Sequence, residues 1–263
     1  MTERKETFSV GPRPRLELRL GTGDVRLVSG LPGSVDVNIR STKPETVIVE
    51  QIGDTVVIRQ DSGLWSAGAF DMTVHAPPGI DVEAALAATD LMVEVDVTDL
   101  QVSVASGDIR ARRVERDATI KSASGDVEID EVGGKLRATA ASGDMTIGVI
   151  AGEATCSTAS GDISIGLAKG ETAAKSASGN VSIDEYRGRE LRGKTVSGDM
   201  RVGLARGARV DVDLQSLTGN LRLPSSPSEA VVRDRPTVRI FFKSVSGDFE
   251  LIETVRPHRE SES

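Results

Sequence analysis

The side chains with the clearest chemical potential in this sequence are five aspartates and one asparagine that recur at a nearly constant interval. They are Asp108, Asp126, Asp144, Asp162, Asn180 and Asp199, and successive members are 18, 18, 18, 18 and 19 residues apart. Each directly follows a glycine, and these glycines are Gly107, Gly125, Gly143, Gly161, Gly179 and Gly198. Ca²⁺ prefers oxygen ligands such as carboxylates that lie close together. A calcium site is therefore the first chemistry that the motif suggests.

The position of the acid within the repeat nevertheless favours a structural role over a metal site. In the calcium-binding β-roll the aspartate stands two residues after the last glycine and recurs twice per coil. Here the acid follows glycine directly and occurs once per repeat, and Asn180 and Asn220 replace it with a neutral amide. Glycine permits the positive φ of a tight turn, and Asp or Asn can accept a hydrogen bond from the turn backbone. The motif is therefore interpreted as a structural turn, with a calcium-stabilised β-roll-like binding module as the alternative.

Other residues that could support catalysis are few. His75 and His258 are the only histidines, and neither has an assignable catalytic partner. Cys156 is the only cysteine, so no internal disulfide can form, and its place in an alternating run indicates a small core residue. A carbohydrate-active β-helix is a second alternative, but Tyr186 is the only aromatic residue between positions 71 and 240. The sequence therefore predicts no enzyme, no metal ligand and no cofactor.

The segments that carry the motif are predicted to be short strands. After each acid, apolar and polar residues alternate, as at Val127 and Ile129 or Ile163 and Ile165, which is typical of a half-buried strand. A glycine turn and a second alternating run complete each period, so one coil holds two strands and two turns. Coils of this kind stack with strands about 4.8 Å apart. The predicted fold is all-β, a single-stranded parallel β-solenoid or β-helix of about 18 residues per coil with irregular β caps. We expect a right-handed coil.

Two columns of inward side chains follow from this alignment. The first comprises Val82, Leu100, Ala118, Leu136, Ala154, Thr172 and Leu191. The second comprises Ala84, Val102, Ile120, Ala138, Cys156, Ala174 and Gly193. The alanine-rich segment 82–90 aligns with a run of β-branched residues one period later, so it is predicted to be a strand rather than a helix.

The repeat also predicts how the chain is organised. We expect a single domain over residues 1–263, with irregular N-terminal β coils or a cap at 7–80, regular repeats at 81–223, a C-terminal cap at 224–252 and a flexible tail at 253–263. Near the C-terminus Phe241 and Phe242 are adjacent, so one of them must face away from the core of a flat strand. This end is a candidate interaction surface, either for an unknown protein partner or for a second copy in a homo-oligomer.

Composition narrows the classes of partner. The chain of 263 residues has a net charge of −8, which argues against sequence-independent binding to nucleic acid. No apolar run approaches the roughly 18 residues that span a membrane, so direct membrane insertion is not predicted. The first residues lack the apolar stretch of a signal sequence, and we therefore expect a cytoplasmic protein.

The repeated "SASGDVEI", "ASGDMTIG" and "ASGDISIG", together with the upstream "MTVHAPPGIDVEA", resemble a bacterial β-strand-repeat family known as "putative adhesin", a domain of unknown function. The likeness covers about residues 7 to 252. It implies a single-domain β-solenoid without established catalysis, in a family often associated with membrane anchors or with cell-envelope stress responses. Together with the residue analysis it predicts a non-catalytic interaction scaffold, linked to the cell envelope or its stress response.

Overall fold

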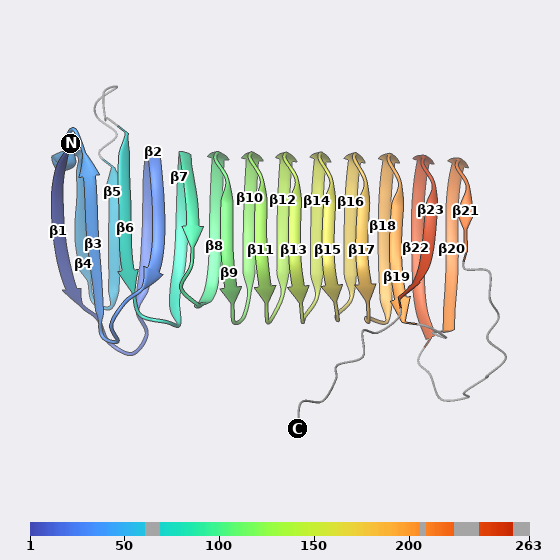
Figure 1. Cartoon of the computed structure of the whole chain (residues 1–263), viewed down its shortest axis with the longest axis horizontal. Coiled ribbons are helices and arrows are strands. Elements are labelled where there is room, and N and C mark those ends of the chain that lie inside the picture. Colours follow the sequence, from blue (N-terminus) through green and yellow to red (C-terminus); the bar gives the residue numbers. More distant parts are fainter. Residues whose placement is uncertain (61–68, 206–208, 224–236, 255–263) are drawn as a thin grey trace.

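The protein is an elongated stack of β coils, shown here in a computed structural model that describes residues 1–60, 69–205, 209–223 and 237–254 (Figure 1). Each regular coil contributes one strand before the Ser-Gly-Asp corner and one after it. We call the sheet of strands before the corner the leading face, and the sheet of strands after it the trailing face. Parallel pairing between successive coils builds both faces, so the predicted all-β parallel solenoid is confirmed.

The regular coils alternate strictly between the two faces. The leading strands are β8 (Val97–Ser106), β10 (Ala118–Ser124), β12 (Leu136–Ser142), β14 (Ala154–Ser160), β16 (Thr172–Ser178) and β18 (Glu190–Ser197). The trailing strands are β9 (Ile109–Val114), β11 (Val127–Val132), β13 (Met145–Ile150), β15 (Ile163–Ala168), β17 (Val181–Tyr186) and β19 (Met200–Ala205). Pairing places Ala118 beside Leu136 and Ala138 beside Cys156, which is the predicted 18-residue register.

The core is a narrow column of branched aliphatic side chains between the faces. Both predicted inward columns are in register across the leading strands, and Ile120, Ala138 and Cys156 are fully buried. Alternation along each strand dictates this arrangement, because every second side chain points to the same side of a sheet.

The N-terminal part mixes the solenoid with antiparallel strands. The long strands β2 (Arg15–Ser29) and β7 (Ile80–Val93) each run across both faces and pair in parallel, which confirms a strand at 82–90. The remaining strands of this part are β1 (Thr2–Ser9), β3 (Ser34–Ser41), β4 (Val47–Ile52), β5 (Thr55–Gln60) and β6 (Phe70–Ala76). Antiparallel pairs β1–β3, β3–β6 and β4–β5 close this end.

Helix is almost absent from the part of the chain that the structure describes. The single element of this kind is the short 3₁₀ turn η1 (Pro44–Thr46). No helix among the described residues is long and apolar enough to cross a membrane.

The C-terminal coils do not follow the order of the sequence. Strands β20 (Arg209–Thr218) and β21 (Leu221–Arg222) form the last coil, whereas β22 (Thr237–Ser246) and β23 (Phe249–Thr254) lie between that coil and β18–β19 (Figure 1). The described part of the C-terminal cap expected at 224–252 therefore belongs to an internal coil, 237–254. Residues 224–236 and 255–263, which include most of the predicted tail, lie outside the described residues.

The side chains of these coils explain why β22 and β23 lie inside the coil of β20 and β21. The inserted coil carries Ile240, Phe242 and Phe249, all of which are 2% exposed or less, and such large apolar groups need neighbours on both sides. Phe242 pairs with Gly193, whose missing side chain leaves room for the ring. The outer coil instead alternates its apolar residues with Asp211 and Asp213, which remain exposed at the end of the stack.

Candidate functional site

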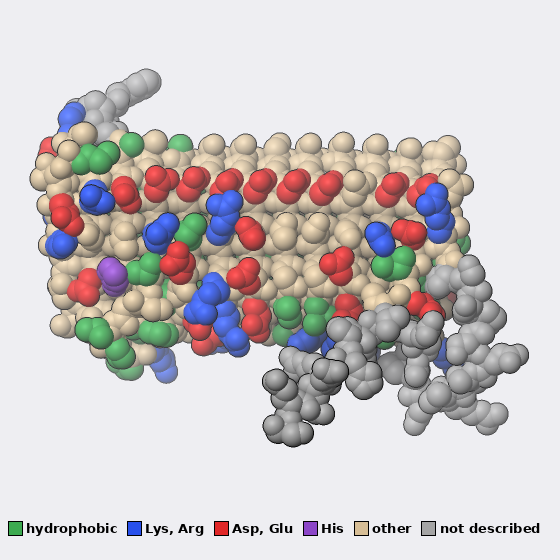
Figure 2. Space-filling model, viewed as in Figure 1, with side chains coloured by type: hydrophobic (Ala, Val, Ile, Leu, Met, Phe, Trp, Pro, Cys, Tyr) green, Lys and Arg blue, Asp and Glu red, His purple; other side chains and the backbone are tan. Residues whose placement is uncertain are grey.

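The Ser-Gly-Asp residues form one continuous hydrogen-bonded ladder along a corner of the stack. In each step the side-chain Oδ1 of one residue accepts the backbone N–H of the corresponding residue in the next coil. The donor–acceptor distance is 2.9 Å from Asp126 N to Asp108 Oδ1, and 2.7 Å from Asn180 N to Asp162 Oδ1. The ladder begins at Asp90 and passes through Asp248 to the last coil, with Asn220 as its final donor. Figure 2 shows a long row of acidic side chains on the surface.

The ladder gives the motif a structural role between coils rather than within one turn. The sequence suggested hydrogen bonds to the backbone of the same turn, but each acceptor serves its neighbour. Asn180 uses its carbonyl oxygen in the same way, accepting Asp199 N at 2.9 Å, so an amide can replace the acid. Among the described residues no group of three or more His, Cys, Asp or Glu is arranged to hold a metal ion.

The glycine of each motif is required by close stacking. Gly143 has a φ of +114°, and a Cβ added there would lie 2.2 Å from the carbonyl oxygen of Gly125 in the preceding coil. A side chain is therefore excluded at this glycine for two reasons: the positive φ of its backbone and its contact with the preceding coil.

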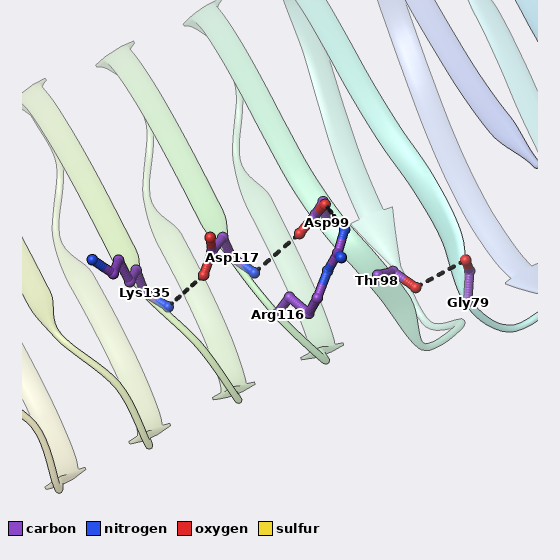
Figure 3. Close-up of polar contacts among 6 residues, drawn as sticks. All are labelled: Gly79, Thr98, Asp99, Arg116, Asp117 and Lys135. Atoms are coloured by element: carbon purple, nitrogen blue, oxygen red, sulfur yellow. Dashed lines mark hydrogen bonds and ion pairs between the residues drawn. The ribbon is translucent and has the colours of Figure 1, made fainter. Parts of the chain in front are cut away.

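A shorter ladder at the opposite corner was missed by sequence analysis (Figure 3). Asp99 Oδ1 accepts Asp117 N at 3.2 Å, and Asp117 Oδ1 accepts Lys135 N at 2.8 Å. Arg116 also pairs with the Asp99 carboxylate. The Lys135 ammonium lies 3.0 Å from Glu153, whose carboxylate raises the pKa of this lysine. An acid recurs at this position along the stack, as Asp81, Asp99, Asp117, Glu153, Glu171 and Glu190, but Lys135 interrupts the series. The sequence analysis followed the glycine-acid motif, and only Glu153 and Glu171 in this series directly follow a glycine.

The last coil is the part of the solenoid that leaves core positions uncovered. Leu221 is 48% exposed, whereas Phe249 and Met200, which occupy the same column one and two coils inward, are 2% and 0% exposed. On the leading face Val212 is only partly buried, while its neighbour Ile240 is fully buried. Within the described residues β20 pairs only with β22. Its outer backbone edge therefore has no partner strand there.

The opposite end of the stack is closed by charged side chains. Arg4 of β1 donates hydrogen bonds to the carbonyl oxygens of Pro44 at 3.2 Å and Val47 at 2.7 Å, and it forms an ion pair with Glu6. Inward-pointing charges of this kind prevent an edge strand from pairing with another chain. The two ends thus differ in chemistry, and the C-terminal coil is the candidate functional site.

Comparison with known proteins places this architecture in a family. The family model described as Toastrack DUF4097 matches residues 16–251, which is nearly the whole stack. The chain belongs to the DUF4097 family. The bacterial adhesin-like domain of unknown function that the repeated motif predicted is therefore confirmed. A comparison with curated proteins finds no match.

Several solved structures are similar to this DUF4097 chain at low identity. A "putative adhesin" from Parabacteroides distasonis has 14% identity and a TM-score of 0.49, with 95% of this chain and 97% of that chain covered. A "putative adhesin" from Bacteroides fragilis has 12% identity and a TM-score of 0.45 over the same shares. A "putative lipid binding protein" from Parabacteroides distasonis has 12% identity and a TM-score of 0.41, with 97% of each chain covered.

The predicted interaction pair Phe241 and Phe242 lies one coil inside the end of the DUF4097 stack. Phe242 points inward, is 1% exposed and packs against Phe249 with ring centroids 5.3 Å apart. Phe241 points outward on the leading face, with the Arg192 guanidinium 6.0 Å from its ring centroid. One ring does face away from the core, but the end itself is formed by β20 and β21.

The residues considered for catalysis are not brought together. His75 lies on β6 at the N-terminal end, and His258 is outside the described residues. Cys156 is fully buried between Ala138 and Ala174, and burial raises the pKa of its thiol to about 12. A thiol in this environment stays protonated at neutral pH and is a poor nucleophile.

Cys156 is therefore expected to be unreactive in the folded protein. A colorimetric disulfide reagent added at neutral pH should release no thiolate on the time scale of minutes, because the sulfur has no solvent contact. In guanidinium the same reagent should report one thiol per chain. Rapid reaction of the native protein, with circular dichroism unchanged, would contradict the buried position.

Proposed function

We propose that this protein is a non-catalytic interaction scaffold that uses the open C-terminal coil as its contact surface, and that the contact is a two-fold dimer with a second copy of the chain. One observation supports the proposal above the others. The inward columns of apolar side chains are buried in the other described coils of the trailing face. At the last coil these columns finish with half-exposed leucines, Leu221 at 48% and Leu223 at 51% exposed. Another coil placed on this end would cover them as Phe249 and Leu251 are covered.

A second copy supplies such a coil without any new structure. In a two-fold arrangement the outer edge of β20 faces the same edge of its partner, and the two strands run antiparallel. Val212 then meets Val212 of the second copy, Val210 meets Leu214 of the second copy, and the core continues from one chain into the other. Burial of apolar area and pairing of free backbone groups both favour this contact.

The closed N-terminal end limits the assembly to two chains. Arg4 and Glu6 lie beside Phe8 on the inward side of β1, so a third chain would meet two charged side chains in that column. A two-fold contact that uses one surface from each chain is also complete in itself. The expected product is a dimer and not a fibre.

The test is the mass of the protein in solution. Sedimentation over a wide concentration range should give a species of twice the chain mass of 27.7 kDa. Replacing both Leu221 and Leu223 with lysine should convert it to monomer, because like charges would face each other across the two-fold axis. Since both side chains are already half-exposed, the melting temperature of the monomer should change little.

A matched control uses an exposed leucine at the other end. Leu31 is 71% exposed and lies in the turn between β2 and β3, so Leu31→Lys adds a charge without touching the proposed contact. It should remain dimeric. The proposal is overturned if the wild-type chain sediments at 27.7 kDa at every concentration, or if Leu31→Lys dissociates the dimer as completely as the double variant.

A further inference from the structure

Three exposed aliphatic side chains form a ridge on the leading face at the C-terminal end of the stack. They are Val196, Val245 and Leu217, which are 45%, 47% and 81% exposed. The register of β22 with β18 and with β20 places them side by side in one outward column, with Val245 in the middle. We call these three residues the aliphatic ridge. Contiguous apolar side chains on a surface mark a contact site, whereas single scattered ones are ordinary.

The fold does not need large side chains at these positions. The same outward position holds alanine in the five preceding coils, which pair in the same parallel register. These alanines are Ala105, Ala123, Ala141, Ala159 and Ala177. Because the repeat folds with alanine there, the two valines and the leucine add apolar surface that core packing does not explain.

A row of lysines runs beside the aliphatic ridge. Lys175, Lys194 and Lys243 occupy the next outward column, on β16, β18 and β22, and we call them the lysine row. None of them forms an ion pair with a described residue, whereas the nearby Arg192 lies 2.6 Å from Glu190. Their like charges repel one another on strands about 4.8 Å apart. An acidic partner would relieve this repulsion.

The other flank of the aliphatic ridge is acidic. Asp199 and Asp248 of the Ser-Gly-Asp ladder each stand three residues after a valine of the ridge, around the corner of the coil. The ridge therefore lies between a basic row and an acidic row. An anionic membrane would face both rows with the same charge, and the acidic row would repel it. A protein segment whose two flanks differ in charge can match both rows.

The spacing of the ridge favours a helix over an extended segment. Three strands about 4.8 Å apart place the outer members of the ridge roughly 10 Å from each other. Along an α-helix, positions i and i+7 are about 10.5 Å apart, with i+3 and i+4 between them. Along a strand, positions i and i+4 are about 13 Å apart, so its side chains would lose step with the coils. A helix is also about 10–12 Å wide, which is enough to reach both flanking rows.

We infer that the aliphatic ridge docks an amphipathic helix of a partner protein, which lies along the axis of the stack. The apolar stripe of this helix covers the ridge. Its acidic flank faces the lysine row, and its other flank, neutral or basic, faces the ladder. The contact uses the outward side of the leading face, whereas the proposed dimer uses the outer edge of β20. Either contact can therefore fail without the other.

The repeat provides variants that remove the contact and keep the fold. Replacing Val196 and Val245 together with alanine restores the residue of the preceding coils. Lys194→Glu reverses one charge of the lysine row. Lys121→Glu is its matched control, because Lys121 occupies the same column on β10, away from the ridge. All of these side chains are exposed, so melting temperature and sedimenting mass should stay those of the wild-type chain.

Selection from two displayed peptide libraries tests the inference. Both contain peptides of about 18 residues, long enough for a helix. In one library leucines recur at i, i+3, i+4 and i+7, in the other at alternate positions, and all other positions are random. The helical library should yield binders with Asp or Glu on one flank. Measured by fluorescence anisotropy, the selected peptide should bind wild type and Lys121→Glu equally. Lys194→Glu should weaken binding about three- to tenfold, and the double alanine variant about tenfold.

Four results would overturn the helix site. The first is a helical library that yields no binder, and the second is a selected peptide that binds the double alanine variant as tightly as wild type. The third is binders from the alternating library that the same variants weaken, which would assign the ridge to an extended segment. The fourth is recruitment of the wild-type chain, but not of the double alanine variant, to vesicles of anionic phospholipid. That result would assign the ridge to a membrane surface.

Discussion

Gly143→Ala is expected to destabilise the fold by about 3 kcal/mol or more, although it adds one methyl group. The residue has a φ of +114°, a conformation that other residues adopt at a cost of about 1–3 kcal/mol. The new Cβ would also lie 2.2 Å from Gly125 O, which is backbone and cannot rotate away. Separating the coils to relieve this contact would lengthen the ladder bonds on both sides, at Asp126 and Asp162. Urea denaturation followed by circular dichroism measures the loss.

Gly53→Ala is the control that isolates the contribution of stacking. Gly53 also has a positive φ, +62°, but it lies in the turn between β4 and β5, where an added Cβ meets nothing within 4 Å. Its replacement should cost about 1–2 kcal/mol from conformation alone. Equal losses for the two variants would show that contact between coils contributes nothing at the Ser-Gly-Asp corner.

The regular part of the stack could be predicted from sequence because the length of the repeat determines the register between strands. A constant interval of 18 residues aligns each strand with the next, and alternation then assigns every side chain to the core or the surface. Cys156 illustrates this, since its alignment with Ala138 and Ala174 was sufficient to place it in the core.

The order of the last coils could not be predicted, because the motif identifies a coil but not its neighbour. Asn220 and Asp248 both follow a glycine in similar segments, and either could bond to Asp199. The choice depends on packing, in which Phe242 faces Gly193 across the interior. The sequence order placed Phe241 and Phe242 at the end for this reason, and the exposed residues of β20 and β21 were overlooked.

The column that holds Arg19, Ala85, Ser103 and Lys121 on the leading face was hidden for a related reason. Lys121, Ser103 and Ala85 are separated by one period each, but Arg19 is 66 residues before Ala85 and belongs to an irregular segment. Only the pairing of β2 with β7 brings Arg19 into this column. A net charge of −8 describes the whole chain, and it does not reveal that strand pairing brings these two cations into one column.

Phe242→Ala is expected to cost about 3–5 kcal/mol, because it leaves a cavity where a large buried ring was. The ring is 1% exposed and packs against Phe249 and over Gly193, and the surrounding parallel strands cannot collapse onto the space. Phe241→Ala, one residue away, removes an outward ring and its contact with Arg192. That loss should be about 1 kcal/mol or less. Urea denaturation of both variants measures these losses. If the slope of the unfolding free energy against urea is the same for both, their midpoints can be compared directly.

The same pair separates core packing from the proposed dimer contact. Both phenylalanines belong to β22, one coil inside β20, so neither should touch the second copy. Phe241→Ala should therefore keep the dimer mass and nearly the stability of the wild-type chain. Phe242→Ala should be much less stable, but its folded fraction should still dimerise. Phe242→Leu, which restores most of the apolar volume, should recover most of the stability. If Phe241→Ala alone yields a stable monomer, the contact surface is the leading face beside Arg192 and not the open end of the stack.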